Sequence, residues 1–192
     1  MQMTWGEIKS HCINLGFSKM TEYKKDPSRF VDAANRAITQ IATTVKPIIK
    51  SIVIPHYPTP NDPDYISYNM KELAENFWDF ADECPSKDGI YPIVYRKIEP
   101  DIILFPKNIS GDITVWYKKL PEKISQETPD SYPLELAYEA AMLVPTLMGF
   151  YVWMDDDPRM AVMFRNDFEE QSTALKLNTS QHPITIKPGK VI

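Results

Sequence analysis

The chain has 192 residues, of which 43% are hydrophobic and 11% aromatic, so it can bury a sizeable core and wholesale disorder is excluded. Its formal net charge is −5 and its lysines and arginines are scattered, which argues against tight binding of nucleic acid through phosphate neutralisation. The N-terminus does not have the pattern of a signal peptide, and the most apolar window, residues 140–154, is shorter than the roughly 20 residues of a membrane-spanning helix.

The first elements in chain order are two helices. Thr4 and Glu7 have the spacing of a capping box, which predicts a helix that continues to about Leu15. Asp26-Pro27 is a cap followed by proline at the first helical position, and it begins a second helix that ends before Lys46-Pro47. Apolar residues recur every three or four positions along this second helix and predict one buried face: Phe30, Ala34, Ala37, Ile38, Ile41 and Val45.

The middle of the chain is predicted to be rich in strands. Residues 48–54 are a β-branched run, residues 55–63 are a proline-rich excursion, and a short helix with Leu73, Phe77 and Phe80 on one side opens at Asn69. Three further strands are predicted at residues 90–98, 101–105 and 112–118, and in the last one Ile113, Val115 and Tyr117 share a face. We therefore expect a meander of three antiparallel strands, which makes a small sheet or sandwich together with residues 48–54.

The last third of the chain predicts a helical hairpin. Residues 134–152 are apolar on most of a helix circumference, and Pro145 is expected to kink this helix. A small protein often buries the second apolar face of such a helix against a neighbouring subunit, so we predict a subunit interface here. Asp157-Pro158 restarts a helix that ends near Leu177, and residues 178–192 are predicted to form an extended arm.

Together these elements predict an α+β protein. Its expected architecture is a helical bundle, made of the N-terminal helix pair and the C-terminal helical hairpin, with an inserted small antiparallel β-meander and an extended C-terminal arm. The corresponding boundaries are residues 1–47 and 130–177 for the helical body, 48–129 for the β-rich insertion and 178–192 for the arm.

The sequence shows no catalytic constellation. Asp155–Asp157 lacks the alternating pattern of a calcium loop, and three carboxylates ahead of a helix favour its dipole, with Asp157 as the cap. The histidines His11, His56 and His182 have no ligand spacing, and the six glycines form no phosphate-binding loop. Cys12 and Cys84 are expected to be free buried thiols, with one disulfide between them as the alternative. We therefore predict no enzyme, no catalytic residue, no metal site and no cofactor.

The order of these elements resembles the head-to-tail adaptor proteins of tailed bacteriophages, also called neck or gatekeeper proteins, and those of short-tailed phages in particular. The segments that carry the resemblance are Val45–Ile48 after the helix pair, Gly111–Pro121 at the end of the meander, Ser131–Ala137, and the hairpin Tyr151–Leu175 with its acidic turn. The likeness covers most of the chain and is best in the last third. Pro145 and the proline-rich excursion at residues 55–63 depart from the family pattern.

The resemblance implies a structural virion protein in the neck of a phage, made in the host cytoplasm. Such adaptors form a homo-oligomeric ring, commonly of twelve copies, that binds the portal protein, extends the DNA channel and docks the tail or nozzle protein. DNA would pass during ejection without specific binding, and no membrane partner is implied. We predict an oligomer and portal interface and a separate tail-facing surface. The interface residues are Ala140, Leu143, Leu147, Tyr151, Ile184, Ile186, Val191 and Ile192, and the tail-facing residues are Tyr95, Trp116 and Lys118.

Two other classes of function stay open. The aromatic residues of the β-meander, Trp116 foremost, fit a carbohydrate-binding module on a phage or surface assembly. A hydrolase or nuclease would have to recruit Asp155–Asp157 or the pair Glu99 and Asp101, and no motif supports it. Loss of glycan retention on replacing Trp116 would identify the first class, and metal-dependent turnover lost in Asp156→Asn the second.

Overall fold

The structure, a computed structural model, describes residues 2–15 and 27–180, with side chains as far as residue 177. The chain divides into two compact units. The helical unit contains residues from both ends of the chain, Met1–Lys46 and Ile124–Ile192, and the β unit is the continuous segment Pro47–Lys123. The main chain therefore passes between the units twice, at Lys46–Pro47 and at Lys123–Ile124.

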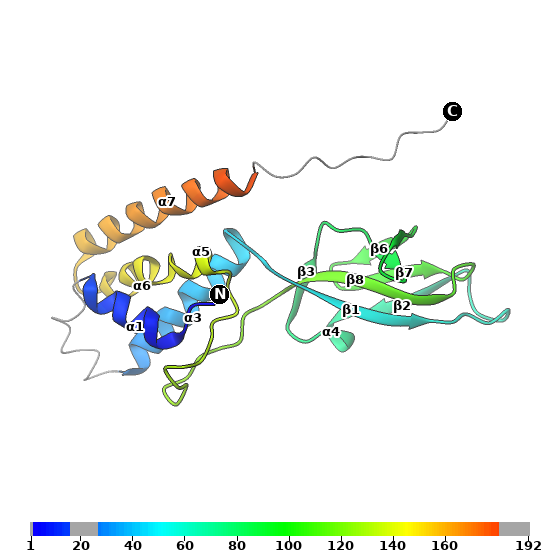
Figure 1. Cartoon of the computed structure of the whole chain (residues 1–192), viewed down its shortest axis with the longest axis horizontal. Helices are drawn as coiled ribbons and strands as arrows, with labels where there is room; N and C mark the ends of the chain where they lie inside the picture. The colour runs from blue at the N-terminus through cyan, green and yellow to red at the C-terminus, as the bar shows by residue number, and fades with distance from the viewer. Residues whose placement is uncertain (1, 16–26, 181–192) are drawn as a thin grey trace. The chain divides into compact units, whose positions relative to one another are not determined.

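The helical unit is built around one apolar helix, α6 (Val144–Trp153). Three other helices pack against α6: α1 (Trp5–Asn14), α3 (Pro27–Thr44) and α7 (Pro158–Ser180). Figure 1 shows α6 between α7 on one side and α1 and α3 on the other. A helix that is apolar all round needs neighbours on every side, and here the same chain supplies them. A short helix, α5 (Tyr138–Ala141), precedes α6.

The N-terminus of α1 is held by the segment that leads into α5. The amides of Trp5 and Gly6 donate to the carbonyl oxygens of Tyr132 and Asp130, each at 2.9 Å. Thr4 and Glu7 form the predicted capping box, so side chains and main chain together satisfy the free donors of the first turn. These contacts tie α1 to residues 130–134 and fix its position in the unit.

A single asparagine binds the chain where it returns from the β unit. The side-chain amide of Asn35 donates to the carbonyl oxygen of Ile124 at 2.9 Å, and its carbonyl oxygen accepts from the amide of Ile124 at 2.9 Å. Asn35 lies in the middle of α3, and its side-chain amide pairs with the main chain of Ile124 as a neighbouring strand would, through one donor and one acceptor.

The β unit contains two antiparallel sheets. In the first, the long strand β8 (Gly111–Lys119) pairs with β1 (Ile48–His56) on one side and with β3 (Phe77–Phe80) and β4 (Ser86–Lys87) on the other, and β4 pairs onward with β5 (Tyr91–Pro92). In the second, β7 (Ile102–Pro106) lies between β2 (Tyr65–Asn69) and β6 (Arg96–Glu99). A one-turn helix, α4 (Met70–Leu73), follows β2 (Figure 1).

The core of the β unit lies between the two sheets. Ile113, Val115 and Tyr117 of β8 point into it, as the alternation in the sequence predicts, and Ile103 and Phe105 of β7 meet them from the second sheet. The other members of this core cluster are Ile54, Met70, Ala74, Phe77 and Phe80.

His56 is completely buried at the edge of this core. Its Nε2 lies 3.2 Å from the carbonyl oxygen of Pro106 and its Nδ1 lies 2.8 Å from the hydroxyl oxygen of Tyr68. Because a carbonyl oxygen only accepts, Nε2 carries a proton and donates to the Pro106 carbonyl oxygen, while Nδ1 shares a hydrogen bond with the Tyr68 hydroxyl. The imidazole therefore has a structural role and links β1 to β2 and β7.

The predicted architecture is wrong. The expected small meander does not exist as one sheet, because β6 and β7 belong to the three-stranded sheet whereas β8 belongs to the five-stranded sheet. The β region is thus a two-sheet structure with its own core and not a small insertion in a helical bundle. The predicted arm is wrong at its start, since residues 178–180 complete α7, and its remainder, residues 181–192, lies outside the described residues.

Two predicted helices also differ from the structure. The long helix over residues 134–152 is replaced by α5 and α6, and Pro145 lies in the first turn of α6, where its missing N–H interrupts no hydrogen bond. The helix predicted from Asn69 through Phe80 ends at Leu73, and Phe77–Phe80 is strand β3. In residues 2–15 and 27–180, no helix combines the length and the apolar character that crossing a membrane requires.

Candidate functional site

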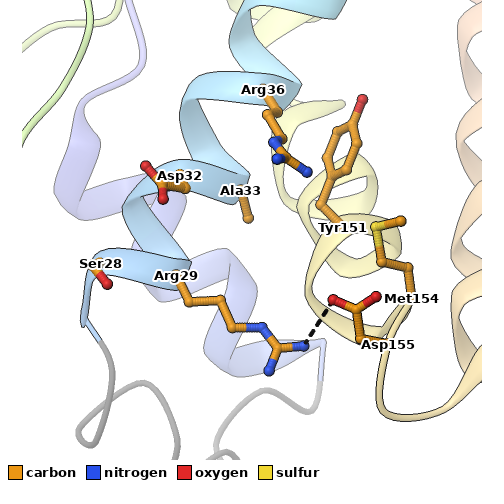
Figure 2. Close-up of a pocket in the computed structure, with 8 residues that line it drawn as sticks. All are labelled: Ser28, Arg29, Asp32, Ala33, Arg36, Tyr151, Met154 and Asp155. Atoms are coloured by element: carbon orange, nitrogen blue, oxygen red, sulfur yellow. Dashed lines mark ion pairs between the residues drawn. The ribbon is translucent and has the colours of Figure 1, made fainter.

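A pocket of about 360 Å³ opens between α3 and the C-terminal end of α6, as Figure 2 shows. α3 supplies five of the eight lining residues, because side chains three to four positions apart on a helix lie on one face. The residues that line it are Ser28, Arg29, Asp32, Ala33, Arg36, Tyr151, Met154 and Asp155.

Arg29 is the central side chain of this pocket. Its Nη2 donates to the carbonyl oxygen of Val152 at 2.8 Å and lies 2.8 Å from a carboxylate oxygen of Asp156 and 4.0 Å from one of Asp155. The guanidinium therefore neutralises the C-terminal end of α6 and the acidic turn that follows it. Arg29 is bound into the structure by these contacts, and its donors already have acceptors within the chain.

Two further polar side chains of the pocket, Tyr151 and Arg36, also have partners within the chain. The Tyr151 hydroxyl donates to the side-chain carbonyl oxygen of Gln40, and the Arg36 guanidinium lies 5.8 Å from the centre of the Tyr151 ring. Histidine and cysteine are absent from the lining, so it contains no nucleophile with an adjacent imidazole base. We assign this pocket a structural role in joining α3 to α6.

Asp157, the third acid of the turn, is the cap of α7. Its Oδ1 accepts from the amides of Arg159 and Met160 at 3.0 and 3.3 Å, which confirms the predicted capping role. Within the described ranges 2–15 and 27–180, no group of three or more His, Cys, Asp or Glu side chains has an arrangement that would hold a metal ion. Glu99 and Asp101 have different surroundings. Glu99 is exposed, whereas Asp101 forms a 2.8 Å ion pair with Lys71, and this pair lowers the pKa of the Asp101 carboxyl group.

The residues predicted for the oligomer and portal interface fall into two groups. Ala140, Leu143 and Leu147 are buried among the helices of their own chain, and Tyr151 is half-buried in the pocket wall. The first three form the core and offer no surface to a partner, so α6 does not need the neighbouring subunit that its composition predicts. Ile184, Ile186, Val191 and Ile192 lie outside the described residues.

The structure brings together two of the three residues predicted to face the tail. Trp116 and Lys118 are two positions apart on β8 and share its outer face, where the Lys118 ammonium forms a 3.2 Å ion pair with Asp79. Tyr95 packs against the core of the β unit instead, and burial is the main cause of the raised pKa of its hydroxyl group.

Exposed apolar side chains on the β unit are the feature that the sequence reasoning missed. Ile49 and Val53 lie on the outer face of β1, Trp78 on β3, and four more large apolar residues lie within residues 90–98: Ile90, Tyr91, Val94 and Ile98. The run from Ile90 to Tyr95 is nearly all apolar and lacks the polar alternation of a half-buried strand, although residues 90–98 are predicted as a strand; this lack of alternation is the signal that the sequence offers. An exposed apolar surface of this kind commonly marks a contact with another protein.

The two cysteines are both free thiols, so the disulfide considered as an alternative is not formed. Cys12 is buried in α1, and burial raises the pKa of its thiol to about 12. Cys84 is exposed, which corrects the expectation that both are buried.

Comparison of the sequence with known protein families and with curated proteins found no match.

Proposed function

We propose that this chain is a structural head-to-tail adaptor of a phage virion. Copies of it would form a ring under the portal protein, extend the DNA channel and provide the platform on which the tail or nozzle protein docks. The resemblance described above, which rests on the order of elements and on the segments Val45–Ile48, Gly111–Pro121 and Ser131–Ala137, is the sequence argument for this function.

The observation that carries the proposal is the exposed apolar surface of the β unit. Ile90 and Val94 are each more than two-thirds exposed, and Ile49, Val53 and Trp78 add to the apolar surface elsewhere on the same unit. An adaptor contacts a neighbouring copy, the portal and the tail at once, so it needs several such surfaces. The net charge of −5 agrees with a channel wall along which DNA slides without binding.

The contacts of the polar side chains in the pocket beside α3 also support this proposal. Its Arg29 guanidinium is bound by Asp155, Asp156 and the end of α6, its Arg36 guanidinium lies over the Tyr151 ring, and the Tyr151 hydroxyl is bound to Gln40. The polar groups of this site thus stabilise the helical unit. A protein in which this pocket has a structural role, and in which several large apolar side chains of the β unit are exposed, is best explained as a part of an assembly.

Light scattering of the purified chain, alone and mixed with the portal protein of the same phage, tests the proposal. We expect a ring on the portal, formed either beforehand or on contact with it. The matched pair of variants is Ile184→Asp with Ile186→Asp against Thr185→Ala with Lys187→Ala, because only the first pair removes the apolar residues predicted to contact the portal. A chain that stays monomeric and ignores the portal would show that the proposal is wrong.

The alternative of a carbohydrate-binding module gains no support from the geometry. A sugar platform needs an open aromatic face, and Trp116 is only partly exposed while Tyr95 packs against the core. Retention on a glycan array that is lost in Trp116→Ala would nevertheless favour that function over the adaptor.

A further inference from the structure

The five-stranded sheet of the β unit has two opposite edges that differ in character. β1 pairs with β8 along its whole length, from Ile48 opposite Lys119 to His56 opposite Gly111. β3 and β4 pair with residues of that same stretch of β8, so they lie on its other side, and β5 continues the sheet beyond β4. We call the first side the β1 edge, with Ile49, Lys50 and Val53, and the second the β5 edge, with residues 82–83 and 88–94.

The β1 edge is apolar with one cation. The side chains of Ile49 and Val53 are 47% and 55% exposed on the outer face of the strand. Lys50 lies opposite Tyr117 and therefore on the other face of the strand from Ile49 and Val53; it is exposed and forms no ion pair within the described part of the chain. Beyond β1 no further strand pairs with it among the described residues, so its outer main-chain groups are also available.

The β5 edge is apolar with several anions. Ile90, Tyr91 and Val94 are 72%, 65% and 71% exposed, which places them among the most exposed apolar residues of the described chain. Asp82 and Glu83 lie in the turn before β4, and Asp88 lies in the turn between β4 and β5; all three are exposed. Two cations lie near these residues and both pack against the β unit. Lys87 packs across Gly111, where an added Cβ would lie 2.8 Å from its Cε, and the Lys97 ammonium lies 4.4 and 5.7 Å from the centres of the Phe80 and Tyr95 rings.

We infer that the β5 edge of one copy binds the β1 edge of a second copy. The two edges carry opposite charge, Lys50 on one and Asp82, Glu83 and Asp88 on the other, and each has the apolar side chains that contact with the other would bury. Pairing of two β1 edges would bring one Lys50 close to another, and pairing of two β5 edges would bring acids together. Charge therefore selects the head-to-tail contact over either symmetric one.

A head-to-tail contact of this kind has a direct consequence for assembly. A contact between two different surfaces of one subunit leaves a free edge at each end of any chain of copies, so it closes into a ring where the rotation between copies permits and otherwise grows as an open filament. The inference rests on the proposed function in identifying the partner as a second copy within such a ring, and it names the surfaces that join the copies.

Sedimentation velocity of three variants and of their mixture tests the inference. The β1-edge variant carries Ile49→Asp and Val53→Asp, the β5-edge variant carries Ile90→Asp and Val94→Asp, and the control carries Val162→Asp, an exposed apolar residue of α7 in the helical unit. Every change is at an exposed side chain, and far-ultraviolet circular dichroism confirms folding. We expect each edge variant to associate at least about tenfold more weakly than the unchanged chain, and the control to associate as the unchanged chain does.

The equimolar mixture of the two edge variants gives the decisive result. Each retains one intact edge, so the intact β5 edge of one binds the intact β1 edge of the other, and a species of twice the monomer mass forms and grows no further. Edge variants that associate normally, a defect confined to the β1-edge variant, or an unchanged chain that never associates even on the portal would each overturn the inference. A chain that associates through these edges but binds no portal would refute the adaptor function while leaving the inference intact.

Discussion

Gly149 lies in the middle of α6, and replacing it by alanine separates two physical arguments that predict opposite results. Helix propensity alone predicts that Gly149→Ala stabilises the protein by about 0.8–1.0 kcal/mol. The structure predicts the reverse, because a Cβ at this position would lie 2.6, 2.7 and 2.8 Å from three atoms of the Phe164 ring. Carbon atoms in contact are about 3.5–4.0 Å apart, so the overlap approaches about 1 Å.

The Phe164 ring has little freedom to avoid this overlap. It is buried between α6 and α7, and the atoms in question are Cγ and the two Cδ atoms, close to the backbone of α7. Overpacking in a core costs about 1–3 kcal/mol, and three such close contacts with a buried ring place this site in the upper half of that range, above the gain from helix propensity. We therefore expect Gly149→Ala to lower the free energy of unfolding by about 1–2 kcal/mol and the Tm by about 2–8 °C.

Urea denaturation followed by circular dichroism at 222 nm measures this effect, because that signal comes mainly from the helical unit. Asn166→Ala on the exposed side of α7 is the control that reports helix propensity alone. In a Phe164→Ala background Cγ and both Cδ atoms are removed, and there Gly149→Ala should stabilise the chain relative to Phe164→Ala alone. If Gly149→Ala is as stable as the unchanged chain in its native background, the argument from the close approach of α6 to α7 is refuted.

Three further predictions follow from described contacts. A thiol reagent should label Cys84 alone in the native protein at pH 8 and both cysteines in guanidinium, because Cys12 is buried and its thiol has a pKa of about 12; rapid labelling of two thiols in the native state would contradict this. Asn35→Ala should lower the free energy of unfolding in urea denaturation by about 1–3 kcal/mol, because it leaves the amide and carbonyl of the returning chain without partners. Asn35→Asp should not avoid this loss, because it places a carboxylate oxygen against the Ile124 carbonyl oxygen; a variant as stable as the unchanged chain would contradict the argument. Thr4→Ala should destabilise α1 by about 1 kcal/mol near pH 7. The hydrogen bonds from Thr4 lower the pKa of Glu7. The stability that Glu7 gains from them is therefore present above its unfolded pKa of about 4.3 and is lost as the pH falls through its folded pKa. A stability difference between the unchanged chain and Thr4→Ala that does not shrink below about pH 4 would exclude that mechanism.

The sequence predicted correctly those features of the structure that depend on residues close together within one helix or strand. The capping box at Thr4, the helix that begins at Pro27, the cap at Asp157 and the inward set of β8 are all short-range patterns, and each is confirmed by contacts in the structure. These features depend on residues three or four positions apart, or on strict alternation, so the chain itself contains the necessary information.

Pairing between distant segments was not predictable in the same way. Phe77 and Phe80 fit one face of a helix, but the structure turns the chain at Asn76, which has a φ of 51°, and β8 provides a strand partner more than thirty residues later. Likewise β8 follows β7 in sequence yet pairs with β1, so the predicted meander fails although its strands largely exist. Strand propensity indicates that a segment is extended, but it does not indicate which other strand the segment pairs with.

The candidate site illustrates the same limit. The apolar composition of α6 correctly predicts burial all round, but only the packing of α1, α3 and α7 shows that the cover comes from within the chain. Burial of Arg29 against the end of α6 joins residues more than a hundred positions apart, and no pattern in the sequence indicates that contact. The exposed apolar residues near Ile90 could have been suspected from composition, whereas their exposure required the fold.

The division of the chain also governs the order in which it folds during synthesis. The β unit is the continuous segment Pro47–Lys123, so it is complete while the ribosome has yet to make α5, α6 and α7. The N-terminal helices, made first, must wait for their partner α6, and α6 in turn stays uncovered on one side until α7 follows some seconds later at about 5–20 residues per second. The nascent chain between Trp153 and the end of α7 is therefore the state most exposed to aggregation, and a chaperone that holds α6 during that interval would raise the yield of folded protein.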